Sequence, residues 1–403
     1  MKIGTAVLFA SILAATAGEA QVPGNPACVQ DFPTAAAADP NATVVMCGLD
    51  NPRGLAFSEF ALFVAEAGRG GLGVTAAPCF TGNAAPMVNN RCYAPTGAIS
   101  RLWNGSQERV ATGFPSHANL QGRMAIGPND IALSPALGAG GGGAAFVAIG
   151  LQQPPAFRTQ YPFLADFAKL ARLDPGGEWR YVADLGAYEA EHDPDSVFFG
   201  LPKLDTNPYG LIADGRNVVV TDAGGNSMLR VVPGGDGSPV EHIVPVAVFP
   251  PNIYPTYADD AVPTSIAIGP DGAYYVGELT GFPLVFNAAN ILRVGRSGRE
   301  SEVCLTGFTQ VIDLTFDRKT GDLYVLQFQG SVVRVRPAPR GNSALANSGD
   351  TCARYGAGQR TTVVSGLTMP TSVEVGPDGA VYVSNRGTFP GTGQVIRFAV
   401  QID

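Results

Sequence analysis

The sequence predicts an all-β fold, a six-bladed β-propeller closed by an N-terminal strand. Two observations carry this prediction. A unit of about four strands recurs six times along the chain. The chain also contains 51 glycines and 32 prolines, too many for a helical architecture, while its hydrophobic fraction of 45% still permits a large core. Short strands with many turns, repeated along a whole chain, are typical of propeller blades.

Each repeat opens with a proline or its replacement, two variable residues and an apolar strand. The six first strands are predicted at 52–57, 128–133, 208–213, 263–268, 311–316 and 370–375. Second strands rich in Val, Tyr and Phe follow at 62–65, 145–148, 218–221, 274–277, 323–326 and 381–384. Gly-Pro-Asp-Gly sequences at 269–272 and 376–379 supply the residues that a tight hairpin turn requires.

A third strand with an arginine at one register is predicted in every repeat. These arginines are Arg101, Arg172, Arg230, Arg293, Arg334 and Arg397. A fourth strand follows in most repeats, but the sixth repeat runs out of chain after Phe398. Because an open strand edge invites pairing with other chains, we expect residues 43–46 to complete the sixth blade. Two unrelated β domains are disfavoured, since the copies run the whole length without a linker.

The first twenty residues predict a secretory signal peptide. Lys2 precedes an apolar run at 6–15 that is too short to span a bilayer, and small residues follow up to Ala20. Residues 21–403 would then form a single propeller domain. No later segment approaches the roughly 20 apolar residues of a membrane helix, so we expect a secreted or extracytoplasmic protein.

The net charge excludes two classes of binding partner, and the cysteines predict disulfides. The net charge is −8 and there is no basic stripe, so we expect neither nucleic acid nor a membrane as partner. A small molecule and an extracellular protein both remain possible as the partner. Six cysteines in an exported chain predict disulfides rather than zinc ligation, with fifteen possible pairings. We prefer Cys28 with Cys47 at the N-terminus, Cys79 with Cys92 inside one loop, and Cys304 with Cys352 between adjacent repeats.

Several long motifs resemble the ScyD/ScyE family of secreted propeller proteins. The most specific are NPRGLAF (51–57), VAEAG (64–68), PTGAI (95–99), NPYGL (207–211), DAGGNS (222–227) and GELTGFP (277–283). The resemblance covers nearly all of the mature chain and implies a six-bladed fold related in shape to NHL-type and gluconolactonase-type propellers. It implies no general activity. A Gly tract at 138–143 and the acidic segment 191–205 depart from the family pattern.

Five carboxylates are expected near the propeller axis. The residues that end the second strands are Glu66, Ile149, Asp222, Glu278, Gln327 and Asn385. Those just before the apolar part of the first strands are Gly54, Asp130, Gly210, Ser265, Asp313 and Ser372. Equivalent positions of a ring lie on one face, so its carboxylates would be Glu66, Asp130, Asp222, Glu278 and Asp313. The channel-facing polar residues around them would be Asn51, Arg53, Asn129, Asn207, Gln327 and Asn385.

Carboxylate and amide oxygens without thiols suit a hard divalent cation such as calcium. The competing interpretation is a structural network in which Arg53, Arg69 and Arg386 pair with the carboxylates. Both stay open from the sequence, and no cofactor is certain. A nucleophilic triad is poorly supported, because the chain has only three histidines and no Gly-x-Ser-x-Gly sequence.

Long insertions rich in aromatic residues and prolines are expected on the same face, at 67–96, 150–168, 188–207 and 278–290. Such loops above a polar channel could form a recognition surface. The competing interpretation, which the residue types favour for most of these aromatics, is that they pack the loops onto the rim of the ring. We therefore expect a secreted propeller that binds a ligand or partner on its loop-bearing face. The alternative is a metal-dependent lactonase-type hydrolase. In it Glu66, Asp222 and Glu278 would hold a cation, and Asp130 or Asp313 would act as the base.

Overall fold

The computed structural model describes most of the chain outside the N-terminus. The described residues are 24–29, 39–58, 61–82, 89–134, 143–199, 203–232, 234, 242–253, 258–298, 301–339 and 350–400. The predicted signal peptide at 1–20 and residues 138–142 of the Gly tract lie outside these ranges. Among the residues that are described, no helix is long and apolar enough to cross a membrane.

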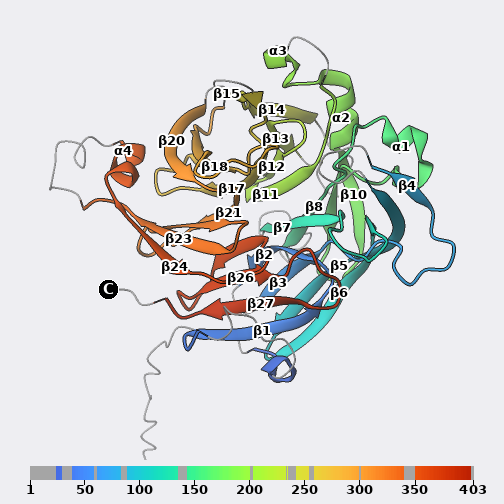
Figure 1. Ribbon diagram of the computed structural model, residues 1–403, viewed down its shortest axis with the longest axis horizontal. Helices are drawn as coiled ribbons and strands as arrows, with labels where there is room; N and C mark the ends of the chain where they lie inside the picture. The colour runs from blue at the N-terminus through green and yellow to red at the C-terminus, as the bar shows by residue number, and fades with distance from the viewer. Residues whose placement is uncertain are drawn as a thin grey trace, which may run out of the picture.

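Six antiparallel sheets lie around a central axis, and each of them is one blade (Figure 1). Blade 1 comprises β2 (Pro52–Phe57), β3 (Ala61–Glu66), β5 (Asn90–Trp103) and β6 (Ser106–Asn119), with the short β4 (Cys79–Thr81) on β5. Blade 2 comprises β7 (Pro128–Ser134), β8 (Ala144–Ile149), β9 (Lys169–Leu173) and β10 (Trp179–Asp184). Blade 3 comprises β11 (Pro208–Asp214), β12 (Asn217–Asp222), β13 (Ser227–Val232) and β14 (His242–Val248).

The remaining three blades follow the same order of strands. Blade 4 comprises β17 (Pro263–Ile268), β18 (Tyr274–Glu278), β19 (Ala289–Val294) and β20 (Ser301–Phe308). Blade 5 comprises β21 (Val311–Phe316), β22 (Leu323–Gln327), β23 (Ser331–Arg336) and β24 (Gln359–Val364). Blade 6 comprises β25 (Ser372–Val375), β26 (Val381–Asn385), β27 (Gly393–Phe398) and β1 (Ala42–Leu49).

Short elements occupy the connections between these strands. They are η1 (Pro26–Val29), α1 (Phe157–Gln160), η5 (Pro162–Leu164), α2 (Leu185–His192), α3 (Ser196–Phe199), α4 (Thr351–Gly356), β15 (Asn252–Ile253) and β16 (Ala258–Asp259). Helices α2 and α3 lie between blades 2 and 3, and the β15–β16 hairpin lies between blades 3 and 4 (Figure 1).

The N-terminal strand closes the ring, as the missing fourth strand of the sixth repeat predicts. β1 pairs antiparallel with β27, with Val44 opposite Ile396. The strand is longer than the predicted residues 43–46, because its pairing continues to Leu49. Met46 is buried among apolar side chains of both blade 6 and blade 1. β1 therefore completes the sheet of the sixth repeat, and the closure prediction is confirmed.

The core lies between neighbouring blades, which explains why the second strands are continuous apolar runs. Every residue of β8 is buried, because one face of the strand packs toward blade 1 and the other toward blade 3. Strands that are covered on both faces lose the alternation of apolar and polar residues. The second strands thus form the middle layer of the ring.

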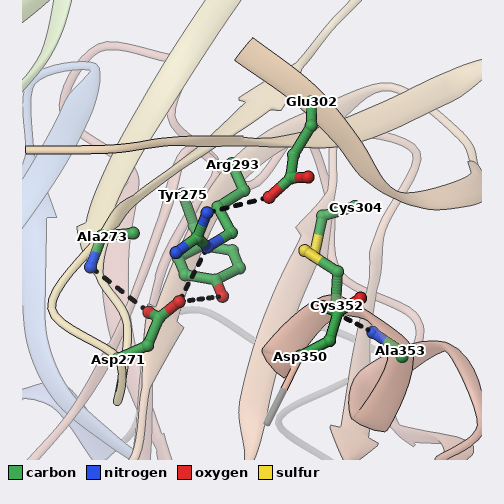
Figure 2. Close-up of a disulfide and its surroundings, with 9 residues drawn as sticks. All are labelled: Asp271, Ala273, Tyr275, Arg293, Glu302, Cys304, Asp350, Cys352 and Ala353. Carbon is green, nitrogen blue, oxygen red and sulfur yellow. Dashed lines mark hydrogen bonds and ion pairs between the residues drawn. A yellow bond between two sulfur atoms is a disulfide. The ribbon is translucent and has the colours of Figure 1, made fainter. Parts of the chain in front are cut away.

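The recurring arginine of the third strand joins that strand to the first hairpin turn. In blade 4, the carboxylate of Asp271 accepts hydrogen bonds from Nε of Arg293 at 2.7 Å and from Oη of Tyr275 at 3.3 Å (Figure 2). In blade 6, Asp378 accepts the same bonds from Arg397 at 2.7 Å and Tyr382 at 3.1 Å. The aspartate of the Gly-Pro-Asp-Gly turn is therefore a structural acceptor.

All three predicted disulfides are present. They join Cys28 to Cys47, Cys79 to Cys92 and Cys304 to Cys352, with Cα–Cα distances of 5.5, 4.0 and 4.9 Å. Figure 2 shows the third of them, which links β20 of blade 4 to α4 of blade 5. It crosses the boundary between two repeats, as the sequence predicts.

Candidate functional site

The second strands end on the face of the ring that carries the long loops. Their last residues are Glu66, Ile149, Asp222, Glu278, Gln327 and Asn385. The carboxylates among them share no hydrogen-bond partner within the described chain. Each is bonded inside its own blade or to the loop that leads into it, so the structure gives them separate roles.

Glu66 is buried and bonded on both carboxylate oxygens. Oε1 accepts hydrogen bonds from Oγ of Ser100 at 2.6 Å and Nε of Arg109 at 2.9 Å. Oε2 accepts from the backbone N–H of Asp50 at 2.6 Å and Nη2 of Arg109 at 2.7 Å. Nη2 of Arg109 also lies 3.1 Å from a carboxylate oxygen of Asp50. Glu66 is thus a buried ion-pair partner with its acceptor sites filled.

The predicted arginine network is present with a different arginine. Arg53 donates to the backbone carbonyls of Gly387 and Ala125 rather than to a carboxylate. Arg386 stacks over the ring of Phe389, with its guanidinium carbon 5.7 Å from the ring centroid. Arg69 alone of the three predicted arginines contacts a carboxylate, that of Asp50, at 3.5 Å. The main partner, Arg109, lies on the fourth strand and has no equivalent among the recurring motifs.

Asp222 and Glu278 bind backbone and side-chain N–H groups of nearby loops. Asp222 accepts from the N–H groups of Asn207, Gly224 and Gly225 at 2.6, 3.0 and 3.0 Å, and from a threonine hydroxyl. Oε2 of Glu278 accepts from the backbone and side chain of Asn290 at 3.2 and 2.8 Å. Burial raises the pKa of Glu278 to about 7.

One structural role recurs at the ends of the second strands. The side-chain oxygens of Glu66, Asp222, Gln327 and Asn385 each accept a backbone N–H from the loop that leads into the first strand of the same blade. These N–H groups lie beyond the strand ladder, and a buried N–H without a partner is costly. Polar residues at these positions are therefore expected for the fold alone.

The aspartates of the first strands link neighbouring blades. Oδ2 of Asp130 on β7 accepts the N–H of Leu211 on β11 at 2.8 Å. Oδ2 of Asp313 on β21 accepts the N–H of Val373 on β25 at 2.8 Å and the hydroxyl of Ser372 at 2.7 Å.

The predicted amides make further links around the same ring. Nδ2 of Asn129 donates to the carbonyl of Pro208 at 2.9 Å and lies 3.4 Å from Oδ1 of Asn207. Nδ2 of Asn51 donates to the carbonyls of Gly68 and Gly122 at 2.7 and 2.9 Å. These predicted channel-face residues therefore form hydrogen bonds that connect neighbouring blades and loops.

The axis nevertheless brings together carboxyl groups of three blades. Asp130 interacts electrostatically with Asp313 and with Glu374 of blade 6, which the sequence analysis did not single out. Burial raises the pKa of Asp130 well above its usual value and that of Asp313 to about 6. Burial and the charge of Asp313 raise the pKa of Glu374 to about 8. In the sequence, Glu374 could have been recognised as a charged residue within the apolar strand at 372–375.

The axial carboxyls predict a fall in stability with rising pH. A carboxyl whose pKa rises on folding holds its proton more tightly in the folded chain, so the free energy of unfolding decreases between about pH 4 and pH 8. Replacing Glu374 with Gln should flatten this decrease above pH 6. Urea unfolding at pH 5, 6, 7 and 8 measures it, with the exposed Glu178→Gln as control. An unchanged slope in Glu374→Gln would contradict the assignment.

A second group of carboxylates lies outside the predicted set. Glu189 on α2, together with Asp193 and Asp195 in the turn after it, places three carboxylate oxygens within 4.8 Å of one another. They belong to the insertion between blades 2 and 3, on the same face as Asp222. Their spacing of four and two residues around a predicted loop was the only sequence signal.

A cleft of about 840 Å³ opens on the opposite face, at the hairpin turns of blades 1 to 3. Its lining includes Phe57, Ser134, Asp174 and Gly215, with Arg318 from blade 5. None of the residues predicted to bind a ligand or metal lines this cleft.

The closed ring of six blades defines this chain as a six-bladed β-propeller protein. No family model and no curated protein matches its sequence. Similar solved structures include the PQQ-bound aldose sugar dehydrogenase of Streptomyces coelicolor, with 11% identity over 89% of this chain and 98% of that chain and a TM-score of 0.48. Regucalcin, a calcium-binding protein of Agrobacterium tumefaciens, has 14% identity over 89% and 94% and a TM-score of 0.45. Streptogramin B lyase has 12% identity over 89% and 96% and a TM-score of 0.42. At these identities the likeness concerns the fold alone.

Proposed function

We propose that this chain is a secreted binding protein that takes up an apolar segment of another extracellular protein on its loop-bearing face. The observation that carries this proposal is the distribution of exposed apolar side chains. Nine of the eleven large hydrophobic side chains that are exposed in the described chain belong to loops of this face. They are Leu72, Val74, Leu120, Val197, Phe198, Ile253, Phe282, Leu284 and Phe286. Apolar groups gathered on one face mark interaction surfaces.

The most exposed of these side chains gather over blades 3 and 4. Phe282, Phe286 and Ile253 are 67%, 70% and 75% exposed. The loop that carries Phe282 is bonded to the segment after the β15–β16 hairpin, because the N–H of Gly281 donates to the carbonyl of Asp260 at 2.9 Å. Asp260 is also ion-paired with Lys203 of the α2–α3 insertion. These contacts connect the three insertions, and we call their exposed apolar parts the apolar rim: residues 196–198, 252–253 and 282–286.

Two further features support this proposal. Three disulfides fit an oxidising, extracellular compartment. The carboxylates of the alternative, the metal-dependent lactonase, already have protein partners: Glu66 binds Arg109, Asp222 binds loop N–H groups, and Glu278 binds Asn290. A hydrolytic cation needs several oxygen ligands free of such partners together with an open position. No observation favours that arrangement at these three residues.

The test uses peptides as probes of the apolar rim. A phage library of random twelve-residue peptides is selected on the mature chain, and the affinities of selected peptides are measured by fluorescence anisotropy. Replacing Phe282 and Phe286 together with serine should weaken binding by about 30-fold or more, because exposed aromatic anchors supply most of an interface's affinity. Trp103→Ser, at a hairpin turn on the opposite face, is the matched control. Equal affinity of the double variant, or failure to select any peptide, contradicts the proposal.

A further inference from the structure

The side chain of Glu189 is fully buried, and neither of its carboxylate oxygens has a hydrogen-bond partner. One oxygen each of Asp193 and Asp195 is likewise buried and unpartnered. One carboxylate oxygen from each of these three residues lies within 4.8 Å of the others. Three carboxyl groups thus lie close together, and each of them has at least one buried oxygen without a hydrogen-bond partner.

The chain builds this arrangement with local devices that hold the carboxylates in place. Helix α2 ends at His192, and Asp193 after it adopts a left-handed conformation with φ of 40° that reverses the chain. The N–H of Asp193 donates to the carbonyl of Glu189 at 2.9 Å, which brings the turn back beside the helix. Nδ2 of Asn226 on blade 3 donates to Oδ2 of Asp195 at 2.8 Å and orients that carboxylate.

The turn between β12 and β13 on blade 3 packs against the carboxylate of Glu189. A Cβ atom on Gly225 would lie 2.6 Å from Oε2 of Glu189, so only glycine allows the carboxylate to approach this closely. Asp222 lies at the start of the same turn and interacts electrostatically with Glu189. The three carboxylates therefore lie between the α2 insertion and blade 3, and an ion bound there would join the two.

Lys203 lies near the cluster and interacts electrostatically with Asp195 and Asp205. The same lysine also forms an ion pair with Asp260. Asp222 and Asp195 place further negative charge around Glu189. A buried carboxylate without a donor or a cation is strongly unfavourable.

We propose that Glu189, Asp193 and Asp195 bind a divalent cation of the calcium class. Calcium prefers oxygen ligands, accepts several carboxylates and tolerates irregular geometry, whereas magnesium requires near-octahedral geometry and keeps its water. The expected ion is the one that the sequence analysis weighed, but the ligands are none of Glu66, Asp130, Asp222, Glu278 or Asp313. The bound ion fixes the segment that leads directly into Val197 and Phe198. This site does not depend on the proposed binding of an extracellular partner, and its test measures calcium alone.

The test is calcium binding by the mature chain after treatment with EDTA and dialysis. We expect isothermal titration calorimetry with calcium chloride to show about one ion per chain. The same salt should raise the melting temperature, because an ion that binds only the folded chain stabilises it. Magnesium chloride at the same concentration should have a smaller effect. Absence of calcium binding, or an equal response to magnesium, overturns the proposal.

The variant Glu189→Gln separates a ligand from a merely structural residue. It keeps the volume of the side chain and removes one charge, so calcium affinity should fall at least tenfold. In EDTA the same variant should melt at or above the temperature of the native chain, because repulsion in the empty cluster is relieved. Glu191→Gln on the exposed part of the same helix should keep native affinity. Retained calcium affinity in Glu189→Gln overturns the proposal. If Glu189→Gln does not fold, the variant Asp195→Asn is tested in its place.

Discussion

A chain that begins at Asp50, and so lacks β1, should no longer fold into a stable monomer. The deletion removes three buried side chains, Val45, Met46 and Leu49, which pack against blades 6 and 1. At roughly 2–3 kcal/mol for each buried aliphatic side chain, the loss is about 6–9 kcal/mol. This is comparable with the whole stability of an ordinary domain. The deletion also leaves β27 as an open edge, which favours association with other chains.

Circular dichroism melting and size-exclusion chromatography measure this effect. The truncation also removes Cys28, so its matched control begins at Asp39, keeps β1 and carries Cys47→Ser to avoid a free thiol. The control should remain monomeric with a cooperative transition. A synthetic peptide of residues 39–50, added with the same serine, should restore structure to the chain that lacks the strand. A monomeric truncated chain with the native melting temperature would show that β1 does not close the ring.

Replacing Arg109 with Met should destabilise the fold by about 3 kcal/mol, because removal of one member of a buried ion pair leaves a buried charge uncompensated. Glu66 is fully buried, whereas Arg109 is partly exposed. The variant therefore leaves the buried carboxylate of Glu66 without a compensating charge. Of its two ion pairs, Asp50 would keep only the longer one, with Arg69 at 3.5 Å. Urea unfolding at pH 7 measures the loss.

A double variant distinguishes the ion pair from simple loss of packing. Glu66→Gln removes the charge that Arg109 balances, so the combination with Arg109→Met should recover most of the lost stability. Arg101→Met serves as the matched control, because Arg101 pairs with Glu108 on the surface of the same blade. Exposed pairs contribute about 0–1 kcal/mol. Equal losses at Arg101 and Arg109 would contradict the structural role of Glu66.

The architecture could be predicted from the sequence because each blade is specified by local patterns. The apolar second strands and the arginine of the third strand recur at one register in all six repeats, and two of the repeats share a Gly-Pro-Asp-Gly turn. The missing fourth strand after Phe398 required a donor, and the segment before the first repeat was the remaining candidate. The cysteine pairing was a preference among fifteen possibilities, in which the alignment placed Cys304 and Cys352 in adjacent repeats, and the structure confirms it.

Only the tertiary structure decided what the carboxylates do. The sequence analysis grouped Glu66, Asp222 and Glu278 by their equivalent positions, yet each binds donors from its own surroundings. Those donors, Arg109 among them, lie outside the repeated positions, so repeat alignment gave no information about them. The cluster around Glu189 belongs to an insertion that occurs in one blade connection alone. Its form depends on the left-handed turn at Asp193 and on the close approach of Gly225. The repeated sequence unit specifies the ring, because equivalent residues of the six repeats occupy equivalent positions in successive blades. Hydrogen-bond partners and unbalanced charge depend on contacts between segments that share no period, and only the folded chain brings those together.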